Sequence, residues 1–167
     1  IAGTVSSVAG VVENTPSTIG SVFTLTDPDL FRGEGTGIGQ VTLTAVSGGF
    51  VLGSGSGVTI TSGNQATDRG AGGWGGGSTT LVFTGNLSQL TAALDGLQYV
   101  TGDNPATSDT ITVTFNDRNN AGVETNGGSS THSASTTITI SSITPTNDAP
   151  VITRPATVTT VEDTDYT

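Results

Sequence analysis

The sequence predicts an all-β domain, and two features of its composition support this. Hydrophobic residues make up 32% of the chain, and Thr and Ser alternate with many of the Val, Ile and Leu residues. This mixture is typical of strands that have one face in water. The 25 glycines predict many turns and long loops between those strands. At 167 residues, the chain is long enough for one domain of good size and the start of a second.

The first half of the chain contains several short alternating segments. We expect β-structure over residues 1–26, including an alternating run over 19–26, and a strand over 40–46, where hydrophobic residues recur at every second position. Residues 50–52 can pair back on that strand after a glycine turn. Glycines also surround a short strand over 58–61 and a long loop or irregular hairpin over 63–77.

One short helix is predicted in the second half, after a strand over 79–84. Asn86 is a helix-capping residue, and Gln89 stands three positions later, as in a capping box. Gly96 ends the helix. Further strands are expected over 97–100, 109–115 and roughly 132–143, and Ile111, Val113 and Phe115 are expected to point inward.

A connector follows the last of these strands. Asn147 and Asp148 precede Ala149 and Pro150, and the residue before a proline is held extended. The four residues 12–15 (VENT) also resemble residues 161–164 (VEDT) at an offset of 149 residues, which indicates a tandem array. We therefore expect one repeat over 1–146, a connector over 147–150 and the first strand of the next repeat over 151–167, as a piece of a longer protein.

The charge of the chain is strongly acidic, with 14 Asp and Glu residues against 4 Lys and Arg residues and a net charge of −10. This balance argues against nucleic acid and anionic membranes as partners, since both attract basic patches. No apolar run approaches the length of a membrane span. Clustered oxygen ligands suit Ca²⁺, whereas the simpler interpretation is that scattered acidity keeps the protein soluble.

Several acidic residues stand at turn positions beside predicted strands. Asp27 and Asp29 flank Pro28 after the second predicted strand, where they are either calcium ligands or turn residues. Asp117 follows the strand over 109–115, and Asn119 is a weaker candidate beside it. Glu13 is either a ligand or an exposed strand carboxylate.

The order of these residues resembles a known pattern. A Glu on the first strand, Asp-x-Asp after the second, an Asp after a late strand and then Asn-Asp-Ala-Pro are similar to the cadherin repeat. The resemblance is closer to the cadherin-like repeats of giant type I-secreted (RTX) surface adhesins of Gram-negative bacteria. Residues 83–97 also look like those adhesin repeats, so the resemblance covers most of the chain.

This resemblance implies a Greek-key β-sandwich of the cadherin/Ig-like kind, with Ca²⁺ at the junctions between repeats. Glu13, Asn147 and Asp148 would then lie at the C-terminal pole. Asp27, Asp29 and Asp117 would lie at the N-terminal pole and face the connector of the preceding repeat.

The chain departs from the family pattern at three places. Pro145 stands where the family connector usually has its first Asp. The family's acidic pair in mid-domain has no clear counterpart, because Asp95 falls on the predicted helix. The Gly-rich range from Gly33 to Gly77 is an insertion larger than an ordinary repeat needs. The C-terminal-pole site is therefore expected to hold fewer ions than a full cadherin junction.

The sequence argues against an enzyme. His132 is the single His, and the chain has no Cys and no Lys, so nucleophile–base pairs and zinc sites lack their usual residues. Trp74 lies among glycines, where it can stack on a sugar or anchor a protein partner. Alternatively, Trp74 folds back onto the sandwich and pins the loop.

The leading hypothesis is a secreted, cell-surface repeat of a bacterial adhesin. Its role would be to extend and stiffen a fibre through Ca²⁺ at the junctions, with neighbouring repeats as partners. One alternative is a subunit of a self-assembling extracellular filament, in which the terminal strand over 151–167 joins identical subunits. Another is a carbohydrate-binding module that uses Trp74.

Overall fold

The computed structural model describes residues 2–3, 7–19, 23–25, 37–68, 74–75, 77–118, 133–148 and 150. Within these ranges the elements follow one another in the order β1 (Ala2–Gly3), β2 (Ser7–Val8), β3 (Val11–Val12), β4 (Ser17–Thr18), β5 (Phe23–Thr24), β6 (Gly39–Ala45), β7 (Gly49–Val51), β8 (Thr59–Ser62), β9 (Thr67–Asp68), β10 (Trp74–Gly75), β11 (Thr80–Gly85), α1 (Leu87–Asp95), β12 (Gln98–Val100), β13 (Asp109–Asn116), β14 (Ser133–Ile140) and β15 (Ile143–Thr144). The predicted all-β sandwich with one short helix is confirmed.

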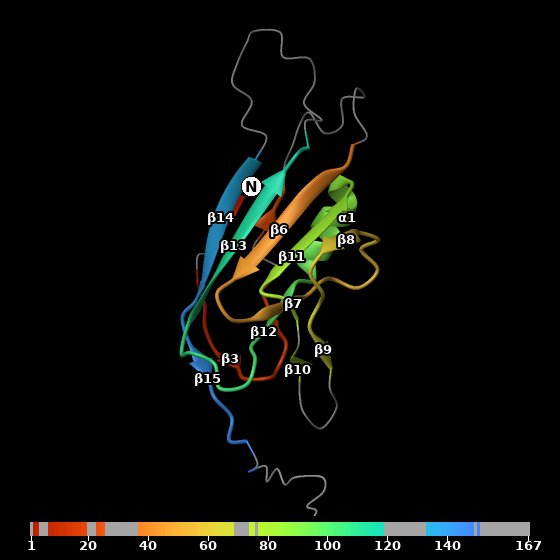
Figure 1. The fold of residues 1–167 in the computed structure, drawn as a ribbon. Helices are drawn as coiled ribbons and strands as arrows, with labels where there is room; N and C mark the ends of the chain where they lie inside the picture. The colour runs from red at the N-terminus through yellow and green to blue at the C-terminus, as the bar shows by residue number, and fades with distance from the viewer. Residues whose placement is uncertain are drawn as a thin grey trace, which may run out of the picture.

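The two main layers are a six-stranded sheet and a three-stranded sheet (Figure 1). The larger sheet has the strand order β2-β14-β13-β6-β11-β8, and the smaller has the order β4-β12-β7. Buried side chains from both sheets and from α1 form one hydrophobic cluster. No helix in the described part of the chain is long and apolar enough to cross a membrane.

Strict alternation builds the centre of the larger sheet. Val41 and Leu43 of β6 are fully buried, whereas the Thr residues between and after them are not. The expected inward residues of β13 are buried as well, and Val113 stands opposite Leu43 in the antiparallel register. One buried and one wet face explain why a chain so rich in Thr forms a stable sheet.

The helix forms as the sequence predicts. The Asn86 side chain accepts from the backbone N–H of Gln89, and the Gln89 side chain accepts from that of Asn86, which completes the capping box. Leu90, Ala93 and Leu94 are buried on one face. Gly53 packs so close to the carbonyl group of Ala92 that a side chain at position 53 would not fit.

Three expectations differ from the structure. The run over 19–26 is not one strand: β4 ends at Thr18, β5 comprises Phe23–Thr24, and residues 20–22 lie outside the described part. The final strand is interrupted by Ser141 and Ser142, which lie between β14 and β15. The Gly-rich range 33–77, which the resemblance marks as an insertion, contains β6, a strand inside the larger sheet.

Another expectation also differs from the structure, because β7 does not pair back on β6. Phe50 stands opposite Tyr99 of β12, so the chain crosses to the smaller sheet after β6. The rings of Phe50 and Tyr99 meet edge to face with centroids 6.4 Å apart. The close packing of Gly48 against the Tyr99 ring leaves no space for a Cβ at that turn, so this aromatic contact directs the crossing.

Asp109, a residue that the sequence did not single out, holds this crossing in place. Its side chain is buried at 5% exposure. Oδ1 accepts from the N–H groups of Val46 and Thr110, and Oδ2 accepts from Ser47, Gly48 and the Tyr99 hydroxyl at 2.5 Å. The carboxylate therefore caps the turn between β6 and β7 and ties it to β12.

The same hydrogen bonds set the ionisation of the pair. Burial by itself would raise the pKa of Asp109, but hydrogen bonds from Tyr99 and from backbone N–H groups outweigh it and lower the pKa below its ordinary value. Burial, and next the Asp109 carboxylate, raise the pKa of Tyr99 well above its ordinary value. The pair is a neutral phenol that donates to a charged carboxylate.

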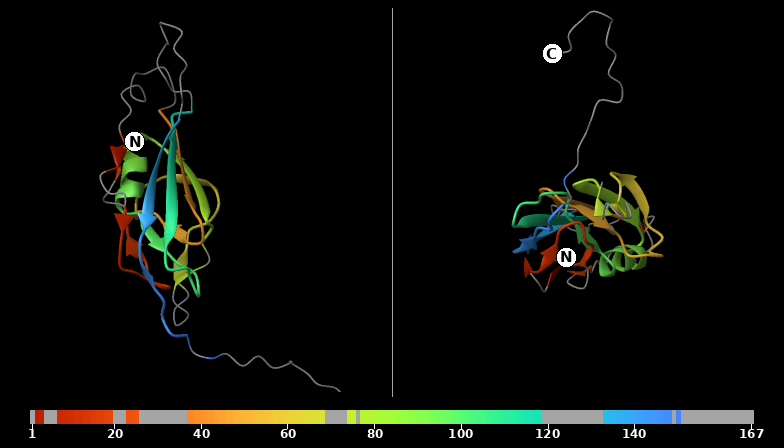
Figure 2. Two further views of the ribbon diagram at one scale, coloured as in Figure 1. Left: turned by 90° about the vertical axis from the view of Figure 1, so that its left-hand side faces the viewer. Right: turned by 90° about the horizontal axis from the view of Figure 1, so that it is seen from below.

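Two strands near the N-terminus, β2 and β3, run parallel to the last two strands, β14 and β15. β2 pairs with β14 in parallel through Ser7 and Thr139, and β3 pairs with β15 in parallel through Val11 and Ile143. Between the two pairs, Ser141 donates its N–H to the carbonyl of Val8 at 2.8 Å. The described N-terminal strand β1 lies at one end of the molecule and the last residues leave from the other (Figures 1 and 2).

We expect Asp109→Asn to lower the free energy of unfolding by about 2–4 kcal/mol, because the new NH₂ group would face donors where an acceptor is required. Urea titration followed by circular dichroism measures this. Asp95→Asn, at an exposed position at the end of α1, is the matched control and should stay within about 0.5 kcal/mol of the wild type. Equal urea midpoints for Asp109→Asn and the wild type would contradict the role of the cap.

Candidate functional site

Glu13 is the centre of the candidate site at the connector end. The side chain is only 2% exposed. Oε1 accepts from the backbone N–H of Asn104 at 2.5 Å, and Oε2 accepts from the backbone N–H of Thr146 at 2.6 Å and from its hydroxyl at 3.3 Å. Glu13 is thus no exposed strand carboxylate, because it joins the end of β3, the loop after β12 and the start of the connector.

The local backbone geometry brings the N–H groups of Asn104 and Thr146 close to the Glu13 carboxylate. The N–H of Glu13 donates to the carbonyl of Thr144 at 3.0 Å, which continues the pairing of β3 with β15 past the strand ends. Asn14 and Asn104 both have positive φ angles, of 54° and 51°. Asn tolerates this left-handed conformation better than most residues, so each supplies the sharp turn that brings its loop to the carboxylate.

Asn14 extends the site beyond Glu13. Its backbone N–H donates to the buried Thr101 hydroxyl, and its Nδ2 donates to Oδ1 of Asp103 at 2.8 Å. Its Oδ1 is buried and has no hydrogen-bond partner among the described residues. If the amide oxygen and nitrogen of Asn14 were exchanged, the oxygen would face the Asp103 carboxylate, and two acceptors would meet. The amide is therefore oriented with Nδ2 toward Asp103. An acceptor oxygen is therefore left for a donor or a cation.

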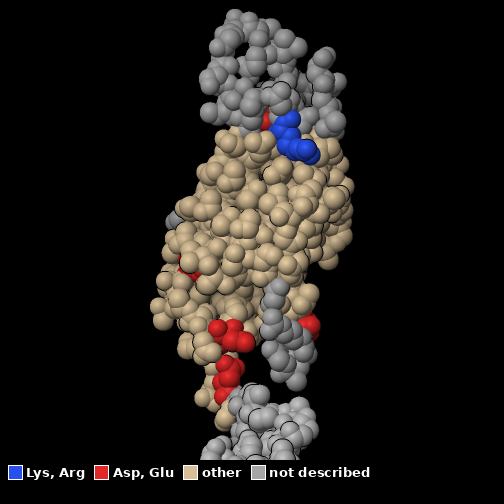
Figure 3. Space-filling model, in the orientation of Figure 1, with Lys and Arg blue, Asp and Glu red and all other residues tan. Residues whose placement is uncertain are grey.

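Acidic side chains gather at this end of the molecule, while the basic side chain among the described residues lies at the opposite end (Figure 3), where Arg118 follows β13. Asp103, Asn147 and Asp148 are exposed there, beside the buried Glu13. All of these donors are oxygens, the ligand type that Ca²⁺ takes. Among the described residues, however, no three Asp, Glu, His or Cys side chains lie close enough to hold a metal ion. The donors fit the chemistry of Ca²⁺, but their number is incomplete.

The other predicted ligands do not join Glu13. Asp117 follows β13, at the end opposite the connector, where it is partly exposed. Asp27, Asp29, Asn119 and His132 lie outside the described residues. The resemblance assigns Asp117 to the opposite pole from Glu13, and calcium ligation by any of these residues stays a prediction.

Trp74 lies near the candidate site. Its backbone N–H donates to the carbonyl of Asn14 at 3.1 Å, and it pairs with Asp68 in the short β9–β10 ladder. Its side chain is partly exposed. The backbone of Trp74 therefore pins the hairpin to the turn that carries Glu13, whereas packing of its ring on the sandwich and sugar binding both stay predictions.

Sequence reasoning missed Asn14, Asp103 and Asn104. Asp95, considered for the family's acidic pair in mid-domain, is the last residue of α1 and is exposed. The polar turn over 102–105 (GDNP) directly after β12 was the available signal. The hydrogen bond from this turn, donated by Asn104, reaches Glu13, which is 91 positions away in the sequence. No local pattern reveals such a contact.

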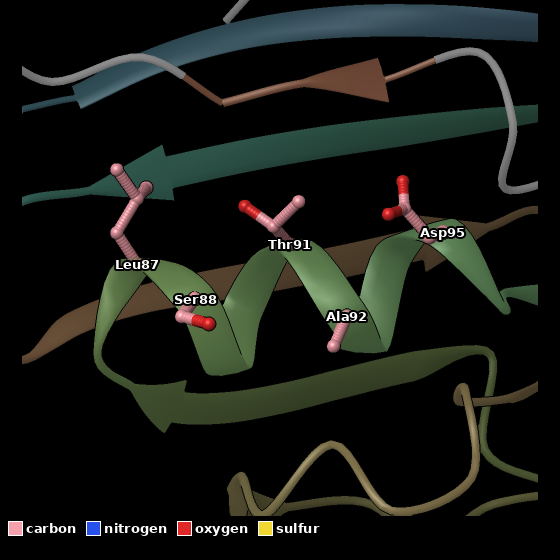
Figure 4. Close-up of a pocket in the computed structure, with 5 residues that line it drawn as sticks. All are labelled: Leu87, Ser88, Thr91, Ala92 and Asp95. Carbon is pink, nitrogen blue, oxygen red and sulfur yellow. The ribbon is translucent and has the colours of Figure 1, made fainter.

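A shallow hollow along α1 is a second place to look for a ligand (Figure 4). Leu87, Thr91 and Asp95 follow one side of the helix and Ser88 and Ala92 follow the other. The lining offers one carboxylate, two hydroxyl groups and two apolar side chains, with no second titratable group. This lining supplies no recognisable binding or catalytic chemistry.

Comparisons with protein-family models, with curated proteins and with solved structures found no match for this chain. The cadherin-like resemblance therefore rests on the motifs quoted from the sequence.

We expect Glu13→Gln to lower the free energy of unfolding by about 2–3 kcal/mol, because its NH₂ group leaves one of the two partly buried N–H donors to the carboxylate unpaired. Hydrogen exchange at Asn104 and Thr146 should accelerate more than exchange in β13. Asp148→Asn, at an exposed carboxylate two residues beyond Thr146, is the control and should change neither rate. An unchanged exchange rate for the Thr146 amide in Glu13→Gln would show that Glu13 does not hold the connector.

Proposed function

We propose that this chain is an extracellular, load-bearing repeat of a secreted bacterial surface adhesin, stiffened by Ca²⁺ at the junctions between repeats. The proposal includes the Greek-key arrangement and the tandem array that the sequence pattern implies. The observation that carries it is the parallel pairing of β2 with β14 and of β3 with β15, next to which Glu13 holds Thr146, the residue before the connector.

This pairing suits a protein that works under tension. When a chain is pulled by its ends, two antiparallel strands of a hairpin separate one hydrogen bond at a time. Parallel terminal strands instead slide along each other, so their hydrogen bonds are loaded together. The bonds that share the load here join β2 to β14 and β3 to β15, and include the bond from Ser141 to Val8.

The positions of the chain ends support an extended array. β1 and the residues after β15 lie at opposite ends of an elongated body (Figure 2). Repeats linked through such ends follow one another in a line. The backbone and carboxylate of Glu13 hold Thr144 and Thr146 respectively, so the direction in which the connector leaves is fixed by the body.

The acidic end supports a cation at the junction. Asp103 contacts the Asn14 side chain and Asp148 follows Thr146, so both add exposed charge at the end that carries the Asn14 Oδ1 acceptor. Ca²⁺ would neutralise carboxylates that otherwise repel one another. Asn147, Asp148 and Glu13 are the proposed ligands of this pole. In the array, the counterparts of Asp27, Asp29 and Asp117 in the next repeat would complete the coordination.

One observation favours the filament alternative. β14 pairs with β2 only at Thr139 and Ile140, so within the described residues its first six positions have one ladder partner, β13. An open strand edge can accept a strand from another chain. A filament subunit would therefore self-associate, whereas a spacer repeat would stay monomeric in size-exclusion chromatography.

Two copies in tandem at the 149-residue offset provide the test of calcium. Millimolar Ca²⁺ should raise the melting temperature and lengthen the particle in small-angle X-ray scattering, and EDTA should reverse both, since ligands bound only by the folded array stabilise it. Asp148→Asn in the first copy should weaken the response, and Asp95→Asn should preserve it. Identical melting curves and dimensions in Ca²⁺ and EDTA would contradict calcium stiffening.

A further inference from the structure

The outer face of the larger sheet carries hydroxyl groups and almost no charge. On β14, β13, β6 and β11, the residues that alternate with the core residues point away from the core. Asp109 is the one charged residue in these four strands, and its side chain is buried. The side of the sheet that faces the viewer is accordingly almost free of acidic and basic side chains (Figure 3). We call the outward side of these strands the threonine face; its central residues are Thr137, Thr112, Thr44 and Thr80.

The strand register sets these four side chains in one row. Thr112 of β13 stands opposite Thr137 of β14 on one side and opposite Thr44 of β6 on the other. Thr44 in turn stands opposite Thr80 of β11. The row therefore crosses four strands that lie about 4.8 Å apart. The result is a regular surface of hydroxyl and methyl groups on a rigid backbone.

A surface of this kind is complementary to a second copy of itself. A hydroxyl group both donates and accepts hydrogen bonds, and the hydroxyl groups of Thr114 and Ser135 in the next row already pair with each other at 2.9 Å. Thr is also β-branched and restricted at χ1, so little side-chain entropy is lost when two such faces meet. Aromatic residues and Arg, which are enriched where unlike proteins meet, are absent from the outward positions of these four strands.

The charge of the rest of the molecule directs a second copy to the threonine face. The chain has a net charge of −10, so two copies repel each other wherever their acidic residues meet. Asp103 and Asp148 are exposed at the connector end, and Asp117 follows β13 at the opposite end. The threonine face lies along the side of the body between these ends. Two copies can therefore meet there without opposed carboxylates.

The area of the face limits the strength of the contact. Four strands about 4.8 Å apart, each with three outward residues, cover on the order of 400 Å². A stable complex of standard size buries about 800 Å² on each partner. A single chain should therefore bind a second copy only weakly. An array presents the same face many times, and after a first contact the next face has an effective concentration on the order of millimolar.

We propose that the threonine face is a lateral contact between copies of this chain in neighbouring arrays, weak for one repeat and effective for several. The inference rests on the proposed function in one respect, that repeats follow one another in tandem. It adds to that function a contact that joins arrays side by side and needs no calcium.

Sedimentation velocity in EDTA tests this contact, with the two-copy tandem protein compared with the 167-residue chain. The tandem protein should self-associate with a dissociation constant on the order of 100-fold lower than that of the single chain, because its second face binds in an intramolecular step. Higher ionic strength should strengthen the association, since salt screens the repulsion between acidic copies.

A charge placed on the face shows where the contact lies. Thr112→Glu in both copies should weaken association about tenfold or more, because opposed carboxylates at the centre of the face repel each other. Thr18→Glu, at an exposed position of β4 in the smaller sheet, is the matched control and should associate as the wild type does. Equal association of the two variants would overturn the assignment to the threonine face.

A charge swap separates a direct contact from a folding defect. Thr112→Lys alone should also prevent self-association, whereas an equal mixture of the Thr112→Glu and Thr112→Lys tandem proteins should regain it, because the opposed charges then attract. A mixture that fails to associate would overturn the face-to-face contact, as would a wild-type tandem protein that stays monomeric at every concentration. Because EDTA is present throughout, this contact can fail while Ca²⁺ still stiffens the tandem protein, and the reverse.

Discussion

The parallel pairing of β2 with β14 and of β3 with β15, together with the hydrogen bonds of Glu13, is the constraint on which the connector end depends. A buried carboxylate is costly unless it is fully hydrogen-bonded. Glu13 meets that requirement with backbone N–H groups from two other segments, Asn104 and Thr146. The loop after β12 and the start of the connector are therefore fixed by the same side chain. These hydrogen bonds give the chain a defined direction where it leaves the body.

A second buried carboxylate has a parallel role within the body. Asp109 caps the turn through which the chain passes from the larger sheet to the smaller one, and it accepts a hydrogen bond from Tyr99. Both carboxylates face backbone N–H groups at places where strands end. The chain thus uses acidic residues where its many Gly and Thr residues provide little apolar packing, which is consistent with a low hydrophobic content of 32%. The exposed acids at the connector end remain available for a cation.

The sequence predicted the parts of the fold that depend on local patterns. Alternation identified β6 and β13, and the capping box at Asn86 identified α1. The pairing of β7 with β12 could not be predicted, because it depends on a turn held by Asp109, 61 residues after Gly48. Glu13 was a candidate from the sequence, whereas the loop at Asn104 was not, since it joins Glu13 only through tertiary structure. The resemblance to adhesin repeats supplied the order of the candidate ligands but not their contacts.

The central claim is that Glu13 and the parallel pairs β2–β14 and β3–β15 bear load. Single-molecule force spectroscopy on a chain held by its two ends tests this claim most directly. Glu13→Gln should unfold at lower force, and its unfolding rate at fixed force should rise about tenfold or more, because it loses a charge-assisted hydrogen bond worth about 1.5–3 kcal/mol. Asp95→Asn, remote from these strands on α1, should unfold at the same force as the wild type. The same unfolding force for Glu13→Gln and the wild type would contradict a load-bearing role for this contact.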